Sequence, residues 1–130
     1  MKLLLDTCCI IWAVSAPASL SRTVISLLGA DDSEISVSPI SSAEIACAES
    51  RGRIKLNQHW KIWFRHYIEL NKWDLIDINL SIIEEAYSLP EFSHSDPVDR
   101  IITATARLNN CTLMTADKKL LDYPHVATVW

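Results

Sequence analysis

The chain has 130 residues, of which 49% are hydrophobic and 22% are charged, a balance that is ordinary for a globular protein. This length predicts a single domain, residues 1–130, that buries roughly two thirds of its unfolded surface. No apolar run approaches the roughly 20 residues that a membrane helix needs, and Asp6 ends the N-terminal apolar run too early for a signal peptide. We therefore expect a cytoplasmic protein that does not engage a membrane.

Short apolar runs and amphipathic stretches alternate along the chain, and they predict strands and helices respectively. In chain order, the sequence predicts a strand at 2–6, helices at 7–14 and 21–28, a strand at 34–38, helices at 41–49 and 58–71, a strand at 75–78, helices at 81–89 and 96–109, a strand at 112–115, a helical turn at 118–121 and a strand at 126–130. Strands that alternate with helices pair in parallel through right-handed crossovers. The expected fold class is therefore α/β, a three-layer α/β/α sandwich with a central, mostly parallel sheet.

Several predicted helices start at recognisable capping residues. Ser21 precedes one helix, and the stretch from Ser41 to Glu44 has the spacing of a capping box. Asp96 before Pro97 starts another helix, because proline fits the first helical position and the residue before it resists the α region. Asp99 then falls in the first turn, where the helix dipole favours an anion.

The cysteines show no Cys-x-x-Cys spacing, which argues against a zinc site and against a disulfide framework. We expect all four to be buried small apolar residues: Cys8, Cys9, Cys47 and Cys111.

The net charge of −4 by itself argues against a nucleic-acid partner, but the cations are unevenly distributed. Six of the twelve Lys and Arg residues lie between residues 51 and 72, where Glu69 is the only acid. The chain is thus acidic overall with one basic segment, residues 51–72.

Four acids follow predicted strands or open predicted helices: Asp6, Glu44, Asp99 and Asp117. In an open parallel sheet, strand ends and the starts of the following helices share one edge, where ligands bind. Clustered carboxylates repel one another unless a cation compensates them. A hard cation such as Mg²⁺ does so through one or two direct carboxylates and several waters, and it can activate a water for attack on a phosphodiester.

Each of these acids also has a purely structural interpretation. Glu44 and Asp99 each suit the third residue of a capping box, and Asp6 and Asp117 suit the caps of the helices that follow them. The shared edge is partly a consequence of the α/β fold. Spacing alone therefore leaves a metal site and a set of helix caps equally open.

Four motifs stand in order along essentially the full chain. They are Leu4-Leu5-Asp6-Thr7 followed by Ile10-Ile11-Trp12, then Ser42-Ala43-Glu44-Ile45-Ala46, then His94-x-Asp96-Pro97-x-Asp99-Arg100, and finally Thr115-Ala116-Asp117. In this order and spacing, the chain resembles the PIN-domain family, and more closely the VapC-type ribonuclease toxins of bacterial toxin–antitoxin pairs. The His-x-Asp-Pro-x-Asp-Arg element is the most specific part of the resemblance.

The resemblance implies the α/β/α sandwich and the cleavage of RNA with Mg²⁺ or Mn²⁺ as cofactor. It also implies an acidic centre that binds the metal and carries the catalysis, made by Asp6, Glu44, Asp99 and Asp117. Two positions depart from the family pattern without touching these acids. Cys8 stands where close relatives often carry histidine, and Ala48 stands where many carry lysine, so phosphate positioning is expected to be weaker.

The residues around the acids have supporting or open roles. Asp96 is a helper at the helix start, and Thr115 matches the family's Ser/Thr that orients ligands or a water. Arg100 either contacts RNA phosphate or pairs with a nearby carboxylate and holds it in place. We expect His94 to support the helix entrance from the loop rather than to transfer a proton.

The predicted helix 58–71 carries one broad aromatic face, made by Trp60, Trp63, Phe64 and Tyr67. Such a face stacks RNA bases, packs into the core or forms a groove that accepts a partner's helix. The resemblance favours the groove, because these toxins are held by an antitoxin that wraps helices around them. It also implies a homodimer, since a free toxin with exposed tryptophans would self-associate. The basic segment either guides RNA through phosphate contacts or is a plain solvated face.

We therefore expect a metal-dependent endoribonuclease that is the toxin of a type II toxin–antitoxin pair. The alternative is a non-catalytic PIN-like module that binds RNA or a protein partner, and the presence of all four acids counts against it. A haloacid-dehalogenase-like phosphatase also ends its first strand in aspartate. It needs a second aspartate two positions on, where this chain has Cys8.

Overall fold

The computed structural model describes residues 1–130 and contains five strands and seven α-helices. The strands are β1 (Lys2–Leu5), β2 (Glu34–Val37), β3 (Asp74–Leu75), β4 (Thr112–Met114) and β5 (Thr128–Val129). The helices are α1 (Thr7–Ser15), α2 (Arg22–Leu28), α3 (Ile40–Ser50), α4 (Trp60–Asn71), α5 (Leu80–Ala86), α6 (Pro97–Leu108) and α7 (Lys118–Leu121), with a 3₁₀ turn at Pro17–Ser19. None of the helices has the length and apolar character that a membrane crossing requires.

The five strands form one fully parallel sheet in the order β3-β2-β1-β4-β5. The chain builds the sheet outward from β1 through β2 to β3, and then returns to the other side of β1 with β4 and β5. The strand order therefore reverses between β1 and β4, and parallel α/β sheets bind ligands at the carboxyl end of such a reversal.

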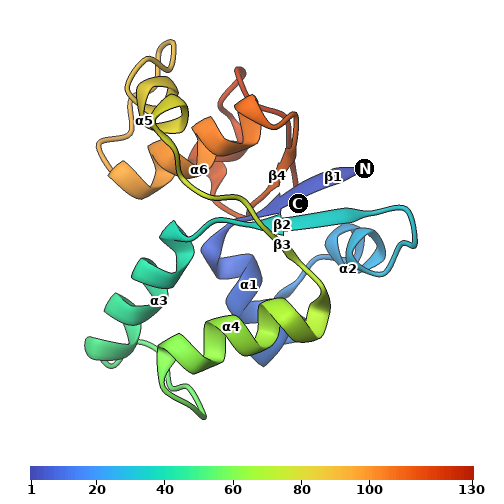
Figure 1. Ribbon diagram of the computed structural model, residues 1–130. Helices are drawn as coiled ribbons and strands as arrows, with labels where there is room; N and C mark the ends of the chain where they lie inside the picture. Colours follow the sequence, from blue (N-terminus) through green and yellow to red (C-terminus); the bar gives the residue numbers. More distant parts are fainter.

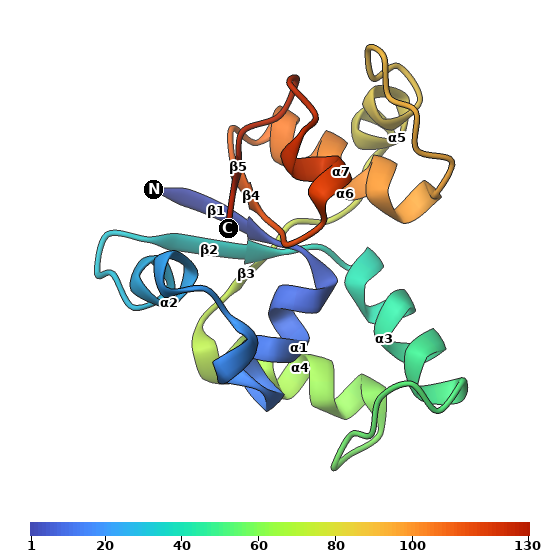
Figure 2. The same cartoon turned by 180° about the vertical axis from the view of Figure 1, so that it is seen from behind.

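The sheet is covered by helices on both faces, as the sequence predicts. Helices α1 to α4 cover one face, and α5, α6 and α7 cover the other (Figures 1 and 2). β1 is buried on both faces, with Leu3, Leu4 and Leu5 all 0% exposed. Its sequence is therefore a continuous apolar run with no polar alternation. Because side chains alternate along a strand, Leu3 and Leu5 pack into the core beneath α1 and α4, whereas Leu4 packs with α6. The predicted α/β/α sandwich is confirmed.

The aromatic face of α4 belongs to the core, so the expectation of an open groove there was wrong for most of it. Trp63 is 1% exposed and Phe64 is buried, and both pack with β1, β2 and α1. Trp60 and Tyr67 are half-buried against the same cluster. Burial of this face stabilises the sandwich, because each large aromatic side chain removes much apolar surface from water. The premise of exposed tryptophans is therefore also wrong.

Both edge strands are shorter than predicted. β3 covers Asp74–Leu75 instead of 75–78, and β5 covers Thr128–Val129 instead of 126–130. Each edge strand pairs with one neighbour only, through a register of two residues. An apolar run therefore overstates the length of an edge strand, because backbone pairing with the neighbouring strand extends only about one residue further, as in the bond from the Ile76 amide to the Val37 carbonyl at 3.0 Å.

Helix α5 begins and ends earlier than predicted. Asn79 caps its start, and Pro90, four residues after Ala86, cannot donate the hydrogen bond that would continue it. The Asn79 side chain accepts a hydrogen bond from the Ile82 amide at 2.9 Å. The helix stops at Ala86, whose carbonyl would pair with the amide of residue 90 if the helix continued. Proline has no amide hydrogen, so the carbonyl instead accepts from the Arg100 guanidinium at 3.0 Å.

Candidate active site

The four predicted acids come together in one groove at the carboxyl edge of the sheet. Asp6 follows β1, Glu44 lies in α3 after β2, Asp99 lies in α6, and Asp117 precedes α7 after β4. All four line a groove of about 770 Å³, which Asp96 also lines. We call it the acidic groove. It lies where the strand order reverses, as the fold requires for a ligand site.

Asp6 is held by hydrogen bonds on both carboxylate oxygens. One oxygen accepts from the Thr7 amide at 2.8 Å, so Asp6 caps α1 as predicted. The other accepts from the Thr115 hydroxyl at 2.7 Å. Thr115 also accepts from the Asp117 amide at 3.1 Å. A single buried hydroxyl therefore joins the ends of two neighbouring strands and orients the Asp6 carboxylate.

Glu44 does not belong to a capping box, so that prediction was wrong. Helix α3 starts one residue before Ser41, at Ile40, with Pro39 as a cap that makes no side-chain bond. Ser41 is 0% exposed, and its hydroxyl forms a hydrogen bond with the Thr7 hydroxyl at 2.9 Å. The Thr7 hydroxyl also makes a short hydrogen bond to Glu44. Because Thr7 and Ser41 bond across α1 and α3, Glu44 is free of a capping role and faces the groove.

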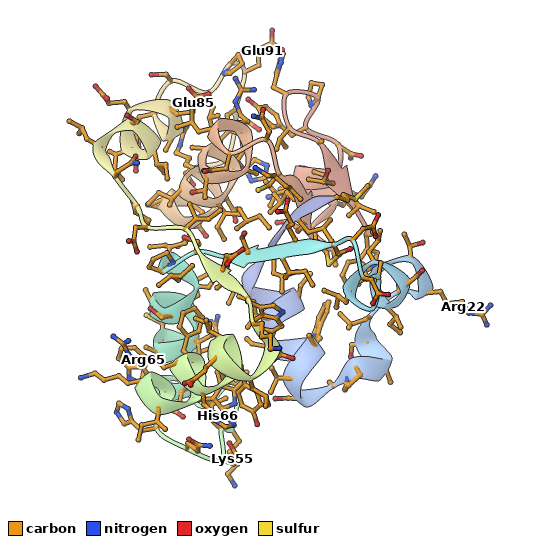
Figure 3. All side chains as sticks on the ribbon, turned by 45° about the vertical axis from the view of Figure 1, so that its right-hand side comes forward. Arg22, Lys55, Arg65, His66, Glu85 and Glu91 are labelled. Carbon is orange, nitrogen blue, oxygen red and sulfur yellow. The ribbon has the colours of Figure 1, made fainter.

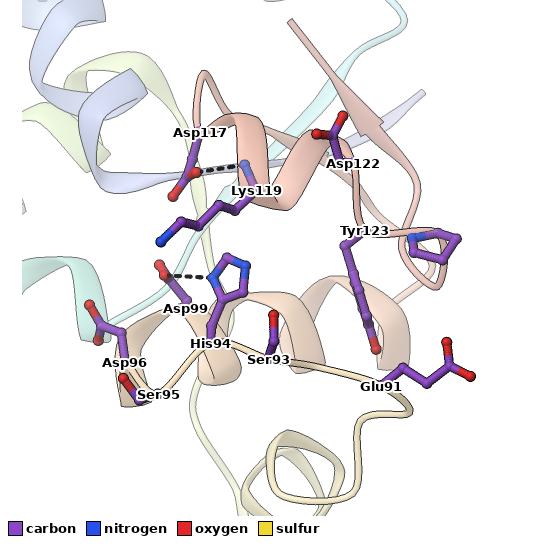
Figure 4. Close-up of a pocket in the computed structure, with 11 residues that line it drawn as sticks. Glu91, Ser93, His94, Ser95, Asp96, Asp99, Asp117, Lys119, Asp122 and Tyr123 are labelled. Carbon is purple, nitrogen blue, oxygen red and sulfur yellow. Dashed lines mark hydrogen bonds and ion pairs between the residues drawn. The ribbon is translucent and has the colours of Figure 1, made fainter.

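The start of α6 carries two aspartates with different roles. Asp96 caps the helix by accepting from the Val98 amide at 2.9 Å, as predicted. Asp99 makes no capping bond; its carboxylate meets Nδ1 of His94 at 3.3 Å (Figure 4). The His94 side chain is 9% exposed and its ring stacks on Phe92 with a centroid distance of 4.6 Å. His94 therefore supports the helix entrance from the loop, as expected, and it does so by holding Asp99.

Asp117 caps α7 by accepting from the Lys119 amide at 2.9 Å. The Lys119 side chain extends from there toward the Asp117 and Asp99 carboxylates (Figure 4). Lys119 lines the continuation of the site on the side of the loop at 91–96. No motif in the sequence includes Lys119. Lys119 could have been found from its position two residues after Asp117, an acid that follows a strand. A helix that starts at such an acid places its first residues at the same edge of the sheet.

The carboxylates of the acidic groove repel one another, and the pKa of three of them is raised. Burial raises the pKa of Asp6, and the charges of Asp99 and Asp117 raise it further, against the lowering by the Thr115 and Thr7 bonds. Burial likewise raises the pKa of Glu44 and of Asp99, with Asp96 adding its charge to both. Each acid thus stands within the field of the others, and no cationic side chain forms an ion pair with the four apart from His94 on Asp99.

The donor set suits a hard divalent cation that is held largely through water. All the groups are carboxylates, which Mg²⁺ and Mn²⁺ prefer, and Mg²⁺ needs only one or two of them directly. No three acidic, histidine or cysteine side chains converge closely enough to ligate one ion together. The carboxylates instead bond to neighbouring hydroxyls, amides and His94. A site with three direct carboxylates would therefore require these side chains to turn.

Arg100 pairs with no carboxylate, so one of its two predicted roles was wrong. Its guanidinium donates to the carbonyls of Ala86 and Phe92 at 3.0 and 3.3 Å. It also lies over the Tyr87 and Phe92 rings, at 5.3 and 5.1 Å from their centroids. The C-terminal end of α5 attracts a cation, so Arg100 turns back to the loop after α5 rather than toward the groove. It fixes the loop that carries His94.

Two of the four cysteines line the acidic groove, so the expectation that all are buried was wrong for these two. Cys9 and Cys111 are buried, whereas Cys8 on α1 and Cys47 on α3 are exposed. Although Cys8 is exposed at the groove surface, the partial loss of water around its thiol and the nearby carboxylates raise its pKa. Composition does not distinguish the two pairs, because burial depends on which side of each helix faces the sheet.

An α/β/α sandwich with an acidic groove at the reversal of its sheet defines a class of protein, and the sequence comparison identifies that class. The profile of the PIN domain matches residues 3–126, so the chain belongs to the PIN-domain family. The resemblance to this family is confirmed. A relative, Ribonuclease VapC22 of Mycobacterium tuberculosis, is 31% identical over 129 residues, which cover 98% of this chain and 97% of the relative.

Solved structures share the fold over nearly the whole chain. The VapBC2 structure from Rickettsia felis, bound to a DNA fragment from its promoter, matches with a TM-score of 0.71 at 20% identity and covers 99% of this chain and 98% of that chain. A toxin–antitoxin complex from Klebsiella pneumoniae matches with a TM-score of 0.66 at 23% identity and covers 98% and 96%.

Proposed function

We propose that this protein is a metal-dependent endoribonuclease, the toxin of a type II toxin–antitoxin pair, and that residues 1–130 act as one nuclease domain. Membership of the PIN-domain family supports this function, together with a relative named as a ribonuclease at 31% identity. A solved structure of the same fold is a toxin–antitoxin complex.

The observation that carries the proposal is the gathering of four carboxylates from four separate segments into one groove. Burial together with mutual repulsion raises the pKa of Asp6, Glu44 and Asp99, which makes the charged groove costly for the folded protein. A set of helix caps would not require this crowding, and Glu44 and Asp99 make no capping bonds. A divalent cation offsets the cost.

In this proposal the metal-holding and catalytic residues are Asp6, Glu44, Asp99 and Asp117. When bound, Mg²⁺ or Mn²⁺ supplies Lewis-acid polarisation of water and of the phosphodiester. The chain's own residues hold the carboxylates in place: Thr115 orients Asp6, and His94 orients Asp99. Asp96 supports the start of α6, and Arg100 supports the site by fixing the loop that carries His94. No covalent intermediate with the enzyme is needed.

The test is cleavage of RNA by purified protein with Mg²⁺ present. We expect Asp6→Asn and Asp99→Asn to reduce cleavage to the background of a protein-free sample, because each removes a charged oxygen donor and keeps the side-chain shape. Asp31→Asn is the matched control, since Asp31 is an exposed acid in the turn before β2, at the opposite end of the strand. Undiminished cleavage by both groove variants would contradict the proposal.

One observation favours the alternative of a non-catalytic binding module. No three acids converge on a common point, although all four line the groove. Titration calorimetry of the isolated protein with Mg²⁺ and with Mn²⁺ separates the two functions. Binding that Asp99→Asn abolishes supports the nuclease, whereas the absence of heat for both ions supports the module.

We propose that the antitoxin binds beside α4. A groove of about 530 Å³ lies between α3, α4 and β3, and Trp60, Phe64, Ile68 and Leu75 give it an apolar lining. Arg65 and Lys61 stand at its rim. This groove keeps part of the predicted function of the aromatic face, because the edges of Trp60 and Phe64 reach it. Co-purification of a co-expressed antitoxin with wild-type protein, and its loss with Ile68→Asp, tests this site.

We also propose a homodimer, which forms through an apolar surface at α5 and not through exposed tryptophans. The exposed large apolar side chains include a stripe on and after α5, at the spacing of one helix face: Leu80 at 72%, Ile83 at 37% and Tyr87 at 61% exposed. Such a stripe favours self-association. Light scattering is expected to give a dimer for wild type and a monomer for Ile83→Asp, and a monomer for wild type would contradict it.

A further inference from the structure

Two arginines line the end of the acidic groove that lies away from Asp99. Arg51 is the C-cap of α3, and Arg53 follows Gly52, whose φ of +69° turns the chain after the helix. Both residues line the same groove as the four carboxylates. The rest of the basic segment does not: Lys55 and Arg65 point away from the body of the protein (Figure 3). The basic segment therefore divides into an outward part and two arginines that face the groove.

Neither of these guanidinium groups has a partner within the protein. The ion pairs of the structure use His94, Arg107 and Lys118. Arg100 binds backbone carbonyls. Arg51 caps the end of α3 seven residues after Glu44, about 10 Å along the helix axis, which is too far for a direct pair with that acid. Ala48 lies between them on the helix and adds no charge. The two arginines thus form a separate position for an anion.

Trp12 forms an aromatic wall in the same groove. It lies on α1, is half-buried and packs against Trp130 with a centroid distance of 5.6 Å. Ile11 and Ile54 also line the groove, so its wall is apolar between the acids and the arginines. A cationic groove with an aromatic platform is the combination by which proteins bind single-stranded nucleic acid, because phosphates pair with the cations and an unpaired base stacks on the ring.

The two sides of the acidic centre differ in charge. On the far side, the continuation of the site is lined by Glu91, Asp96 and Asp122, with Lys119 as its single Lys or Arg residue. A polyanion that reaches the four carboxylates is therefore repelled on that side and attracted on the side of Arg51 and Arg53. An acidic peptide would also meet the arginines, but only a phosphodiester chain must pass from the arginines to the acids for cleavage to occur.

We infer that the acidic groove continues into a binding arm for single-stranded RNA, in which Arg51 and Arg53 hold phosphates that flank the cleaved one and Trp12 stacks on an unpaired base. This inference rests on the proposed nuclease function and adds the residues that would hold the RNA outside the acidic centre.

The arginines are tested by the salt dependence of binding. A labelled 12-nucleotide RNA of mixed sequence is titrated by fluorescence anisotropy in EDTA, so that no cleavage occurs. Loss of two phosphate contacts is expected to lower the slope of log K against log salt by about 1.4 in Arg51→Gln/Arg53→Gln, at about 0.7 per contact. The matched control is Lys2→Gln/Arg22→Gln, which removes the same charge from β1 and α2, away from the groove (Figure 3 shows Arg22). The control is expected to keep the wild-type slope.

Trp12 is tested against its own packing partner. Trp12→Leu is expected to weaken binding of the single strand by about 5- to 150-fold, the effect of losing one stacked base. Trp130→Leu removes the other ring of the same pair and does not line the groove, so it controls for lost packing and is expected to bind normally. Trp12→Phe is expected to restore most of the affinity. A duplex of the same sequence is expected to bind equally to wild type and Trp12→Leu.

Two results would overturn the inference. One is an unchanged salt slope in Arg51→Gln/Arg53→Gln, which is also the result expected if these arginines hold an acidic protein partner instead. The other is equal RNA affinity of Trp12→Leu and Trp130→Leu. Cleavage assays keep this outcome separate from failure of the proposed function. Wild type that cleaves RNA, with KM unchanged in Arg51→Gln/Arg53→Gln, contradicts the binding arm alone, whereas wild type that cleaves no RNA contradicts the nuclease.

Discussion

At the scale of single residues, two buried threonine hydroxyls have opposite situations. Thr115 is 0% exposed, donates to Asp6 at 2.7 Å and accepts from the Asp117 amide at 3.1 Å. Thr103 is also 0% exposed, but its hydroxyl has no hydrogen-bond partner. A buried polar group without a partner costs free energy, whereas a satisfied one that loses its partner leaves other groups unsatisfied. The same substitution therefore has different effects at the two positions.

We predict that Thr115→Val lowers the free energy of unfolding by about 1–3 kcal/mol, because it removes the donor to a mostly buried carboxylate. Thr103→Val is the matched control and is expected to be neutral or stabilising, since it removes an unsatisfied hydroxyl of similar size. Urea unfolding followed by circular dichroism measures both. Equal losses for the two variants would mean that the Thr115 bonds are not important for stability.

At the scale of elements, the start of α6 combines a helix cap and a groove carboxylate without conflict. Asp96 supplies the cap through the Val98 amide, which leaves Asp99 free to face the groove and to pair with His94. Pro97 at the first helical position reinforces this start. The two aspartates are three residues apart on the chain and have separate tasks, so substitutions at each should affect different properties.

We predict that Asp96→Ala lowers the free energy of unfolding by about 0.5–2 kcal/mol through loss of the cap, whereas Asp96→Asn keeps it, because asparagine caps helices equally well. Asp99→Asn is expected to abolish cleavage without lowering stability, since it removes a repelling charge and no cap. Thermal unfolding and RNA cleavage measured on the same samples check this. Destabilisation of Asp96→Asn as large as that of Asp96→Ala would contradict the capping role.

At the scale of the whole molecule, the acidic groove makes stability depend on pH. Burial and repulsion raise the pKa of Asp6, Glu44 and Asp99 above their values in the unfolded chain. The folded protein therefore keeps these protons at a pH where the unfolded chain has lost them. Stability accordingly falls as the pH rises from the ordinary carboxyl pKa to the raised one, and the full cost is present above it.

We predict that Glu44→Gln raises the melting temperature by a few degrees at neutral pH in EDTA. The amide oxygen still accepts from Thr7, while the repelling charge is gone. The advantage over wild type is expected to shrink as the pH falls to about 4, where wild-type Glu44 is also protonated. Mg²⁺ is expected to stabilise wild type more than the variant. An advantage that does not depend on pH would contradict a charge effect.

Much of this fold could be predicted because the signals are local. The buried strand at Leu3–Leu5, the cap at Asp96 and the α/β alternation each depend on residues that are neighbours in the chain. The errors fall where the deciding partner is distant. The Ser41–Glu44 spacing matched a capping box, but Thr7 on another helix binds both side chains. One prediction for Arg100 was a pair with a carboxylate, but Pro90 leaves a carbonyl at Ala86 that attracts it.

The sequence by itself determined the order of strands and helices, the family, and which acids stand at strand ends and helix starts, because apolar periodicity and motif spacing are properties of the chain. The tertiary structure alone decided which residues share the groove with those acids. It turned Arg51, Arg53 and Trp12 into the groove, placed Cys8 and Cys47 beside them, and buried Trp63 in the core. The reason is physical: a helix presents several faces, and only its packing against the sheet selects the one that is buried.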